Sequence, residues 1–294
     1  MTSLPATATH HDETIRSADG TPLKAWWWPQ AQTEPRGVLV IAHGLGEHGG
    51  CYRSVAEALG PALGIDILAL DFRGHGRSPG RRGYVRRYGE LVADLHAALG
   101  WAERARPGRA RFVLGHSNGG LVALRALLER QEEIAGLIVS NPAVRLAGRV
   151  PRHKRVAGAV LRRVAPWVTL ATDVGPEKMT RDPAMLTERE TDPLRHTRIS
   201  AQIYYGMVEG GPYVQERAGL IRTPTLMILS GADPVIDSKG SQELFDELGS
   251  ADKTLRIYPG MLHEPLNELG REQVLSDVTA WLENHLPQPC HEAL

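Results

Sequence analysis

The stretch FVLGHSNGGLVALRALL, residues 112–128, decides the fold. The apolar run Phe112–Leu114 predicts a buried strand, and the periodicity of Leu121–Leu128 predicts a helix that follows almost at once. Between them lies GHSNG, residues 115–119, a turn so tight that Ser117 must adopt a strained backbone and side chains at the two glycines would collide with neighbouring elements. Such a turn projects the Ser117 hydroxyl into a cleft at a helix N-terminus, where a nucleophile is expected.

Short apolar runs bounded by Gly, Pro or Asp recur along the chain, as is typical of buried strands in a mostly parallel sheet. The first two flank an Asp-Gly pair and predict a hairpin. Helical periodicities lie between the later runs, so the sequence predicts an α/β fold, a doubly wound sheet with helices on both faces. The predicted strands are Thr14–Arg16, Leu23–Trp28, Val38–Ala42, Ile65–Leu70, Phe112–Leu114, Leu137–Ser140, Thr225–Leu229 and Thr254–Tyr258.

Residues 142–216 break this alternation, because they hold helical segments but no convincing strand. They fall between two predicted strands, so we interpret them as a helical cap insertion over the carboxyl edge of the sheet, where ligands bind in such folds. The core would then comprise residues 1–141 and 217–294.

A serine hydroxyl needs a base that takes its proton, and the base needs a group that orients it. Asp233 follows the predicted strand Thr225–Leu229, and His263 follows Thr254–Tyr258. Both therefore lie at strand ends whose loops converge on Ser117, and we predict a catalytic triad of Ser117, His263 and Asp233.

Other acids and histidines compete for these roles, and each has an alternative interpretation. Asp237 is favoured as a helix cap, and Glu264 is expected to point away from Ser117. His285 and His291 are expected at the surface. These interpretations leave Asp233 and His263 as the preferred partners.

The loop HGLGEH, residues 43–48, follows another predicted strand, and its glycines allow close backbone approach. The backbone N–H groups of Leu45 and Asn118 are the predicted donors to a developing oxyanion. His43 is favoured as a structural residue that orients this loop. The loop DFRGHGRS, residues 71–78, is expected to be rigid, with no catalytic role for His75.

Bulk composition excludes several classes of protein. The 294 residues suit one large α/β domain with an insertion, and 34 basic residues balance 34 acidic ones. The two cysteines form no disulfide framework or metal motif, and no signature of nucleic-acid binding accompanies the basic residues. With neither a signal peptide nor a membrane-spanning run in the sequence, we expect a cytoplasmic protein without metal or cofactor.

Five stretches resemble the monoacylglycerol lipase and lysophospholipase group of α/β-hydrolases: HGLGEHGGCY, DFRGHGRS, GHSNGG, SGADPVIDSKGS and KTLRIYPGMLHEPLNE. The resemblance runs from about residue 13 to 286 and is weakest across the insertion. It implies an α/β-hydrolase fold with an eight-stranded, mostly parallel sheet and a helical cap. It also implies a triad and an oxyanion hole at the positions deduced above, and no cofactor. We further assign Gly44, Glu47 and His116 to substrate binding.

The sequence departs from that group at three positions. Cys51 stands where the group often has an arginine, which in monoacylglycerol lipases helps shape the polar end that holds glycerol. Leu266 replaces a second histidine of the mammalian enzymes, and Asn118 replaces a commoner methionine. The first two departures leave the head group of the substrate open. Cys51 itself is favoured as a small packing residue over a second nucleophile.

The insertion begins with a basic segment that contains no Asp or Glu between residues 145 and 163. Its apolar residues Val156, Val160, Leu161 and Val164 can share one helix face, with Trp167 close behind. A basic amphipathic helix indicates contact with a membrane surface. The favoured alternative is a solvated charged face whose apolar side packs on the sheet. The basic residues are Arg145, Arg149, Arg152, Lys154, Arg155, Arg162 and Arg163.

These observations predict a serine hydrolase that cuts carboxylic esters through an acyl-enzyme. Expected substrates are monoacylglycerols, lysophospholipids or simpler acyl esters, with transient contact between the cap and a membrane. A general carboxylesterase, an acyltransferase or an amide hydrolase remains an alternative. A serine nucleophile argues against the dehalogenases and epoxide hydrolases of this fold, which use aspartate. A receptor on a hydrolase scaffold is the alternative from another class, and the oligomeric state is left open.

Overall fold

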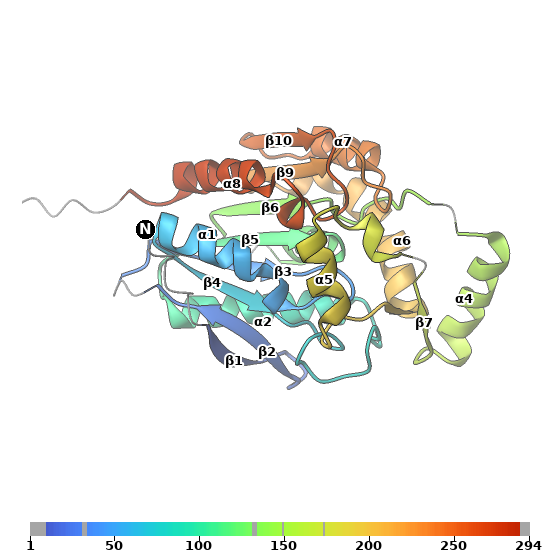
Figure 1. The fold of residues 1–294 in the computed structure, drawn as a ribbon. Helices are drawn as coiled ribbons and strands as arrows, with labels where there is room; N and C mark the ends of the chain where they lie inside the picture. Colours follow the sequence, from blue (N-terminus) through green and yellow to red (C-terminus); the bar gives the residue numbers. More distant parts are fainter. Residues whose placement is uncertain (1–9, 31–33, 131–133, 149, 173, 289–294) are drawn as a thin grey trace, which may run out of the picture.

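An eight-stranded sheet forms the centre of the molecule in the computed structural model, which describes residues 10–30, 34–130, 134–148, 150–172 and 174–288 (Figure 1). The spatial order is β1-β2-β4-β3-β5-β6-β9-β10. The strands β4, β3, β5, β6, β9 and β10 run parallel to one another, whereas β2 is antiparallel to both β1 and β4. The mostly parallel eight-stranded sheet expected from the sequence is confirmed. The strands are β1 (His11–Arg16), β2 (Pro22–Trp28), β3 (Gly37–Ala42), β4 (Ile65–Leu70), β5 (Ala110–His116), β6 (Gly136–Ser140), β9 (Thr225–Ser230) and β10 (Lys253–Tyr258).

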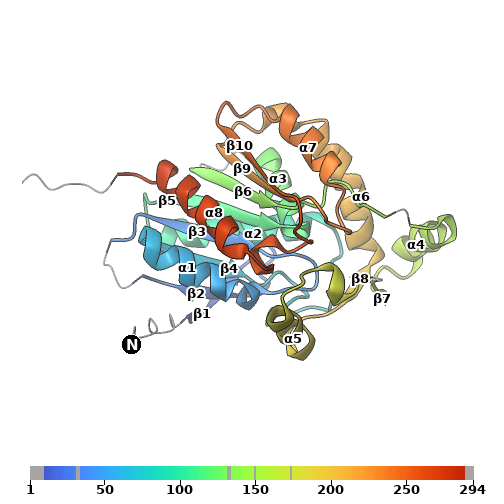
Figure 2. The same cartoon turned by 45° about the horizontal axis from the view of Figure 1, so that its top comes forward.

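Helices cover both faces of the sheet, because the central strands carry apolar side chains on both. Helices α1 (Arg53–Leu63) and α8 (Arg271–His285) lie on one face of the sheet (Figure 2). On β3, Leu39 and Ile41 pack in the same buried cluster as the side chains of these two helices. Val38 and Val40 alternate with them and face the opposite layer. That layer holds α2 (Gly89–Ala105), α3 (Asn118–Glu129) and α7 (Ser238–Glu247). Short 3₁₀ turns complete the core at η1 (Gly49–Tyr52), η3 (Ala218–Leu220) and η4 (Pro265–Asn267).

The chain leaves the sheet after Ser140, the end of β6, and returns to it at Thr225, the start of β9. The intervening segment holds a two-stranded antiparallel sheet, so the expectation of no strand there was wrong. Each of these strands has only three residues, too few to show a periodicity in the sequence. The elements of the segment are α4 (Arg152–Val164), β7 (Thr169–Ala171), η2 (Pro176–Lys178), α5 (Pro183–Thr191), β8 (Arg198–Ser200) and α6 (Ala201–Gln215).

Helix α6 is joined to the core by its apolar face. Ile203, Met207 and Val214 are buried in the same cluster as the side chains of α2 and α3. Ser200 caps the helix by accepting a hydrogen bond from the N–H of Ile203. The inner part of the insertion therefore shares the hydrophobic core that supports the sheet.

Helix α4 lies at the periphery of the molecule and behaves differently (Figures 1 and 2). Val156, Val160 and Val164 are 58%, 53% and 65% exposed, and Trp167 is 52% exposed. The favoured interpretation, an apolar side packed on the sheet, was therefore wrong. The helix is fastened at its flank instead, where Arg162 forms an ion pair with Glu209 of α6. Arg149 lies outside the described residues. No helix among the described parts of the chain is long and apolar enough to cross a membrane.

Candidate functional site

The turn between β5 and α3 holds Ser117 in a backbone conformation that side chains rarely adopt, with φ 51° and ψ −118°. Glycine is required on either side of it. A Cβ atom at Gly119 would lie 2.1 Å from the carbonyl oxygen of Ala42, and one at Gly115 would lie 2.7 Å from the carbonyl oxygen of Gly119. Ser117 is anchored to the end of β6, since its N–H donates to the carbonyl of Ser140 at 2.9 Å.

The three residues predicted as a triad lie in hydrogen-bonding order. Nε2 of His263 is 2.9 Å from Oγ of Ser117, and Nδ1 of His263 is 2.7 Å from Oδ2 of Asp233. Asp233 and His263 both follow the carboxyl ends of strands, β9 and β10. This arrangement can move a proton from the Ser117 hydroxyl to the imidazole while Asp233 fixes the imidazole's orientation.

Asp233 is held as a carboxylate by its surroundings. Its other oxygen, Oδ1, accepts hydrogen bonds from the N–H groups of Val235 at 2.7 Å and Ile236 at 3.0 Å. Burial raises the pKa of Asp233, but the hydrogen bond from His263 and these two N–H groups outweigh it, and the pKa lies below its ordinary value. The carboxylate therefore remains charged and ready to pair with an imidazolium.

The competing residues have other partners. Asp237 caps α7 by accepting a hydrogen bond from the N–H of Lys239, as expected. Glu264 forms an ion pair with Arg189 of α5 instead of turning toward Ser117. The side chain of His285 is 13% exposed and pairs with Asp252, so the expectation of a surface position was only partly met. His291 lies outside the described residues.

The predicted oxyanion loop, residues 43–48, is held in place by two of its own buried side chains, those of His43 and Glu47. Oε2 of Glu47 accepts hydrogen bonds from the N–H of Gly44 at 2.8 Å and from the hydroxyl of Tyr52 at 2.9 Å. Nε2 of His43 accepts a hydrogen bond from the N–H of Phe72 at 3.1 Å, in agreement with its expected structural role. These bonds fix the backbone on both sides of Leu45, the predicted donor in this loop.

The other predicted donor, Asn118, begins α3 directly after Ser117. Its side-chain Oδ1 accepts a hydrogen bond from the hydroxyl of Tyr88 at 2.7 Å. That bond uses the acceptor oxygen of the side chain and fixes its orientation, while the backbone N–H of Asn118 is the donor predicted for the oxyanion. His116 precedes Ser117, and its ring packs 4.9 Å from that of His263; burial lowers the pKa of His116 below its ordinary value.

Asn141 is a functional candidate that the sequence did not reveal. It follows β6 with a φ of 42° and is almost fully buried. Its Nδ2 donates to the carbonyl of His263 at 2.8 Å and to Oγ of Ser230 at 2.9 Å, while its Oδ1 accepts from the N–H of Ser230. The side chain thus joins the ends of β6 and β9 to the loop that carries His263.

One group of possible metal ligands occurs in the described ranges. The donor atoms of His48, Cys51 and Asp192 lie within 4.8 Å of one another. Nε2 of His48 is already 2.6 Å from Oδ2 of Asp192, and the Arg195 guanidinium acts electrostatically on Cys51. That positive charge opposes a cation, and the group is better explained as a contact between the core and the insertion. Cys51 is buried, in agreement with a packing role, and burial raises its pKa above the ordinary value.

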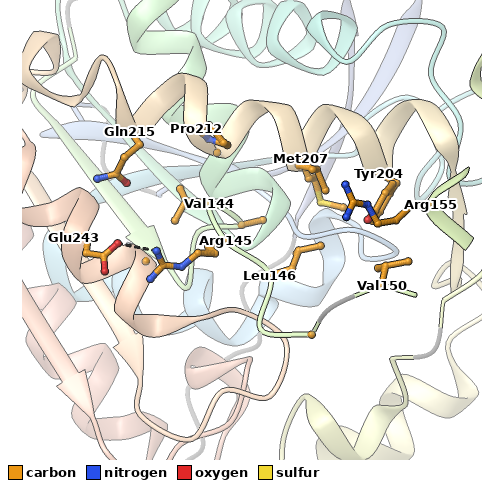
Figure 3. A pocket seen from close by; sticks show the side chains of 15 residues that line it. Val144, Arg145, Leu146, Val150, Arg155, Tyr204, Met207, Pro212, Gln215 and Glu243 are labelled. Atoms are coloured by element: carbon orange, nitrogen blue, oxygen red, sulfur yellow. Dashed lines mark hydrogen bonds and ion pairs between the residues drawn. The ribbon is translucent and has the colours of Figure 1, made fainter. Parts of the chain in front are cut away.

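An apolar cleft of about 600 Å³ separates α6 from the loop after β6 and from α4 (Figure 3). Val144, Leu146, Met207 and Val208 line it. Ala143 also lines it and donates its N–H to the carbonyl of Ser117 at 2.9 Å. At the rim, Arg145 pairs with Glu243. The wall of the cleft is therefore linked to Ser117 through the backbone of Ala143.

Comparison with known proteins places this chain among hydrolases. A family model described as serine aminopeptidase, S33, matches residues 33–270. The monoacylglycerol lipase of Mycolicibacterium smegmatis is 36% identical over 261 residues, which cover 88% of this chain and 92% of that protein. The monoglyceride lipase of Homo sapiens is 31% identical over 275 residues, 90% of this chain and 88% of that protein. The crystal structure of Paleococcus ferrophilus monoacylglycerol lipase superposes with a TM-score of 0.81 at 31% identity, covering 90% of this chain and 99% of that one.

Proposed function

Because this chain belongs to the hydrolase family described as serine aminopeptidase, S33, we propose that it hydrolyses carboxylic esters of lipids, with monoacylglycerols as its main substrates. The observation that carries the proposal is the row Ser117–His263–Asp233, with separations of 2.9 and 2.7 Å, beside an apolar cleft. Support for the lipid comes from the similarity to monoacylglycerol lipases.

In the proposed reaction, Oγ of Ser117 attacks the ester carbonyl while Nε2 of His263 takes the hydroxyl proton. The N–H groups of Leu45 and Asn118 stabilise the oxyanion of the tetrahedral intermediate. Breaking the carbon–oxygen bond releases the alcohol, which receives the proton from His263. A water molecule, deprotonated by His263, then attacks the acyl carbon of the acyl-enzyme. The bond from that carbon to Oγ of Ser117 breaks, Oγ takes the proton back from His263, and the fatty acid leaves. Asp233 orients the imidazole and stabilises its charged form in both steps.

The two ends of the substrate would meet different surroundings. We place the acyl chain in the cleft beneath α6, whose Val144, Met207 and Val208 are apolar. We place the alcohol near the oxyanion loop and retain Gly44, Glu47 and His116 as the residues on that side. Glu47 would act there mainly through the backbone, since its Oε2 already accepts two hydrogen bonds.

Helix α4 would bring the enzyme to its substrate at an anionic membrane surface. The exposed stripe Val156, Val160 and Val164 offers the apolar face, and exposed Arg152 and Arg163 offer positive charge near it. Burial of such a face at the headgroup boundary, together with attraction to anionic lipid, is the mode by which interfacial helices bind. Cosedimentation with phosphatidylglycerol vesicles tests this contact. A triple substitution of the valines with serine should release the protein, and equal sedimentation of that variant would rule the contact out.

The substrate proposal is tested with a matched panel of esters. Fatty-acid release is measured from 1-oleoylglycerol and oleoyl-lysophosphatidylcholine, alongside nitrophenyl butyrate and leucine nitroanilide. We expect 1-oleoylglycerol to give the highest kcat/KM, with Ser117→Ala inactive on every ester. Preference for the nitroanilide would replace the lipid by a peptide. Tight retention of lipid without turnover would favour a receptor.

A further inference from the structure

The stretch Asp192–His196, between α5 and β8, lies directly on the oxyanion loop. The N–H of His196 donates to the carbonyl of Gly46 at 3.0 Å, and Oδ2 of Asp192 is 2.6 Å from Nε2 of His48. Two residues of the insertion thus hold two residues of the loop that carries Leu45. Arg195 lies between these fastening points, so its side chain enters the site from the insertion.

The Arg195 side chain is only 11% exposed and faces two buried carboxylates. Its Nη1 lies 3.8 Å from Oε1 of Glu47 and 3.8 Å from Oε1 of Glu264. Nε and Nη1 donate no hydrogen bond within the described residues. A buried guanidinium normally uses its fork of donors, so this one acts chiefly through its charge.

That charge bears on the carboxylate that holds the oxyanion loop. Burial raises the pKa of Glu47, but the charges around it and the N–H of Gly44 outweigh burial and hold this pKa well below its ordinary value. A proton on Oε2 of Glu47 would compete with the N–H of Gly44 and the hydroxyl of Tyr52, which both donate to that oxygen. The titratable and charged groups that face Glu47 are His116 from β5, Cys51 and Tyr52 from η1, Arg189 from α5, Arg195 from the loop after it, and Glu264 beside His263.

We propose that Arg195 is a positioning residue for ester hydrolysis: it fixes the Glu47 carboxylate, and through Glu47 it fixes the N–H of Leu45 for the oxyanion. The role rests on the serine ester hydrolysis proposed above and not on the identity of the lipid head group. The insertion would then contribute to catalysis, because the positive charge that faces the core carboxylate Glu47 comes from Arg195 of the insertion.

Cys51 offers a way to separate the charge from the residue that carries it. Its thiol lies close enough to Arg195 for each to act electrostatically on the other. An arginine at position 51 would reach the same pair of carboxylates from the core side. Moving the guanidinium from position 195 to position 51 therefore keeps a positive charge beside the same carboxylates, and the unfolding temperature reports the cost of the larger side chain at this buried position.

The test measures kcat, KM and their pH dependence on nitrophenyl butyrate, an ester without a glycerol head group. Arg195→Met should lower kcat about 10- to 100-fold with little change in KM, because a displaced oxyanion donor affects the transition state. The loss should be greatest at acidic pH and shrink as pH rises, because the pKa of Glu47 rises when one of the positive charges that lower it is removed. The matched control is Arg162→Met, which removes a paired arginine of α4 and should leave both constants unchanged.

Two further variants separate positioning from general stability. Arg195→Lys keeps the charge and should retain most of the kcat and the native pH profile. The double variant Cys51→Arg/Arg195→Met should recover most of the kcat that Arg195→Met loses. Thermal unfolding of each variant is measured in parallel. Native kinetics in Arg195→Met would overturn the proposal. A loss of kcat in Arg195→Met that neither Arg195→Lys nor the double variant restores would also overturn it. A lower melting temperature of Arg195→Met would then assign the loss to reduced stability. Inactivity of the native protein on this ester would instead count against the proposed function.

Discussion

Helices α6 and α4 belong to the same segment between β6 and β9, yet they differ in the burial of their apolar side chains. Helix α6 buries Ile203 and Met207 against the core, whereas α4 leaves Val160 and Val164 more than half exposed. The difference teaches that an insertion is not one functional unit. Its inner helix supports the catalytic frame, and its outer helix presents a surface that folding does not require to be apolar.

The largest expected effect concerns the predicted triad. The same substitution, aspartate to asparagine, can be made at two nearby positions, Asp233 and Asp237. Asp233→Asn should lower kcat about 10⁴-fold, because the amide no longer holds the required imidazole tautomer. Asp237→Asn should leave kcat unchanged, because asparagine caps a helix as well as aspartate does. Steady-state hydrolysis of nitrophenyl butyrate measures both. Equal effects at the two positions would contradict the assignment of Asp233.

A stability measurement compares the two helices directly. Ile203→Ala should cost about 2–5 kcal/mol of unfolding free energy, because it leaves a cavity in the shared core. Val160→Ala should change the stability by less than about 0.5 kcal/mol, because its side chain is already exposed. Urea unfolding curves of both variants and the native protein supply the values. A large cost at Val160 would mean that α4 packs more closely than its exposure indicates.

Asn141 connects the core strands to the loop of His263, so its loss should affect chemistry more than binding. Asn141→Ala should lower kcat about tenfold or more with KM nearly constant, because His263 is displaced from Ser117. Asn141→Gly tolerates the positive φ and separates lost hydrogen bonds from backbone strain. If the glycine variant recovers native kcat, the strain and not the hydrogen bonds would account for the loss.

The smallest expected effect concerns the cleft beneath α6. Val208 lines this cleft and is 40% exposed, so a larger side chain can be placed there without opening the core. Val208→Trp should lower kcat/KM for oleoyl esters several-fold, leaving butyrate esters nearly unaffected, because it fills space that only a long chain would use. Leu220→Trp is the matched control, because Leu220 is 66% exposed on η3 and does not line the cleft. Equal loss on both chain lengths would remove the acyl chain from this cleft.

The sequence predicted the sheet well because buried parallel strands leave a strong local pattern. Ile65–Leu70 was placed at its observed bounds, and Thr225–Leu229 ended one residue early. The turn around Ser117 was equally predictable, because its close backbone contacts require glycine at positions 115 and 119, and both glycines are visible in the sequence.

What the sequence could not provide depends on contacts between distant segments. Asn141 acquires its role only because β6 lies beside β9, and Arg195 only because the stretch after α5 reaches back to Glu47. The exposed face of α4 carries the same periodicity as a buried one, so its pattern could not show which side faced water. The strands β7 and β8 were too short to be seen.

The measurement that tests the central claim most directly is the site of covalent capture by a long-chain fluorophosphonate. The protein is labelled with and without 1-oleoylglycerol, and the modified peptide is identified by mass spectrometry. The account predicts one adduct, on Ser117, that forms more slowly when the lipid is present and does not form in Ser117→Ala. An adduct on another residue, or ester hydrolysis that persists after Ser117 is fully modified, would contradict it.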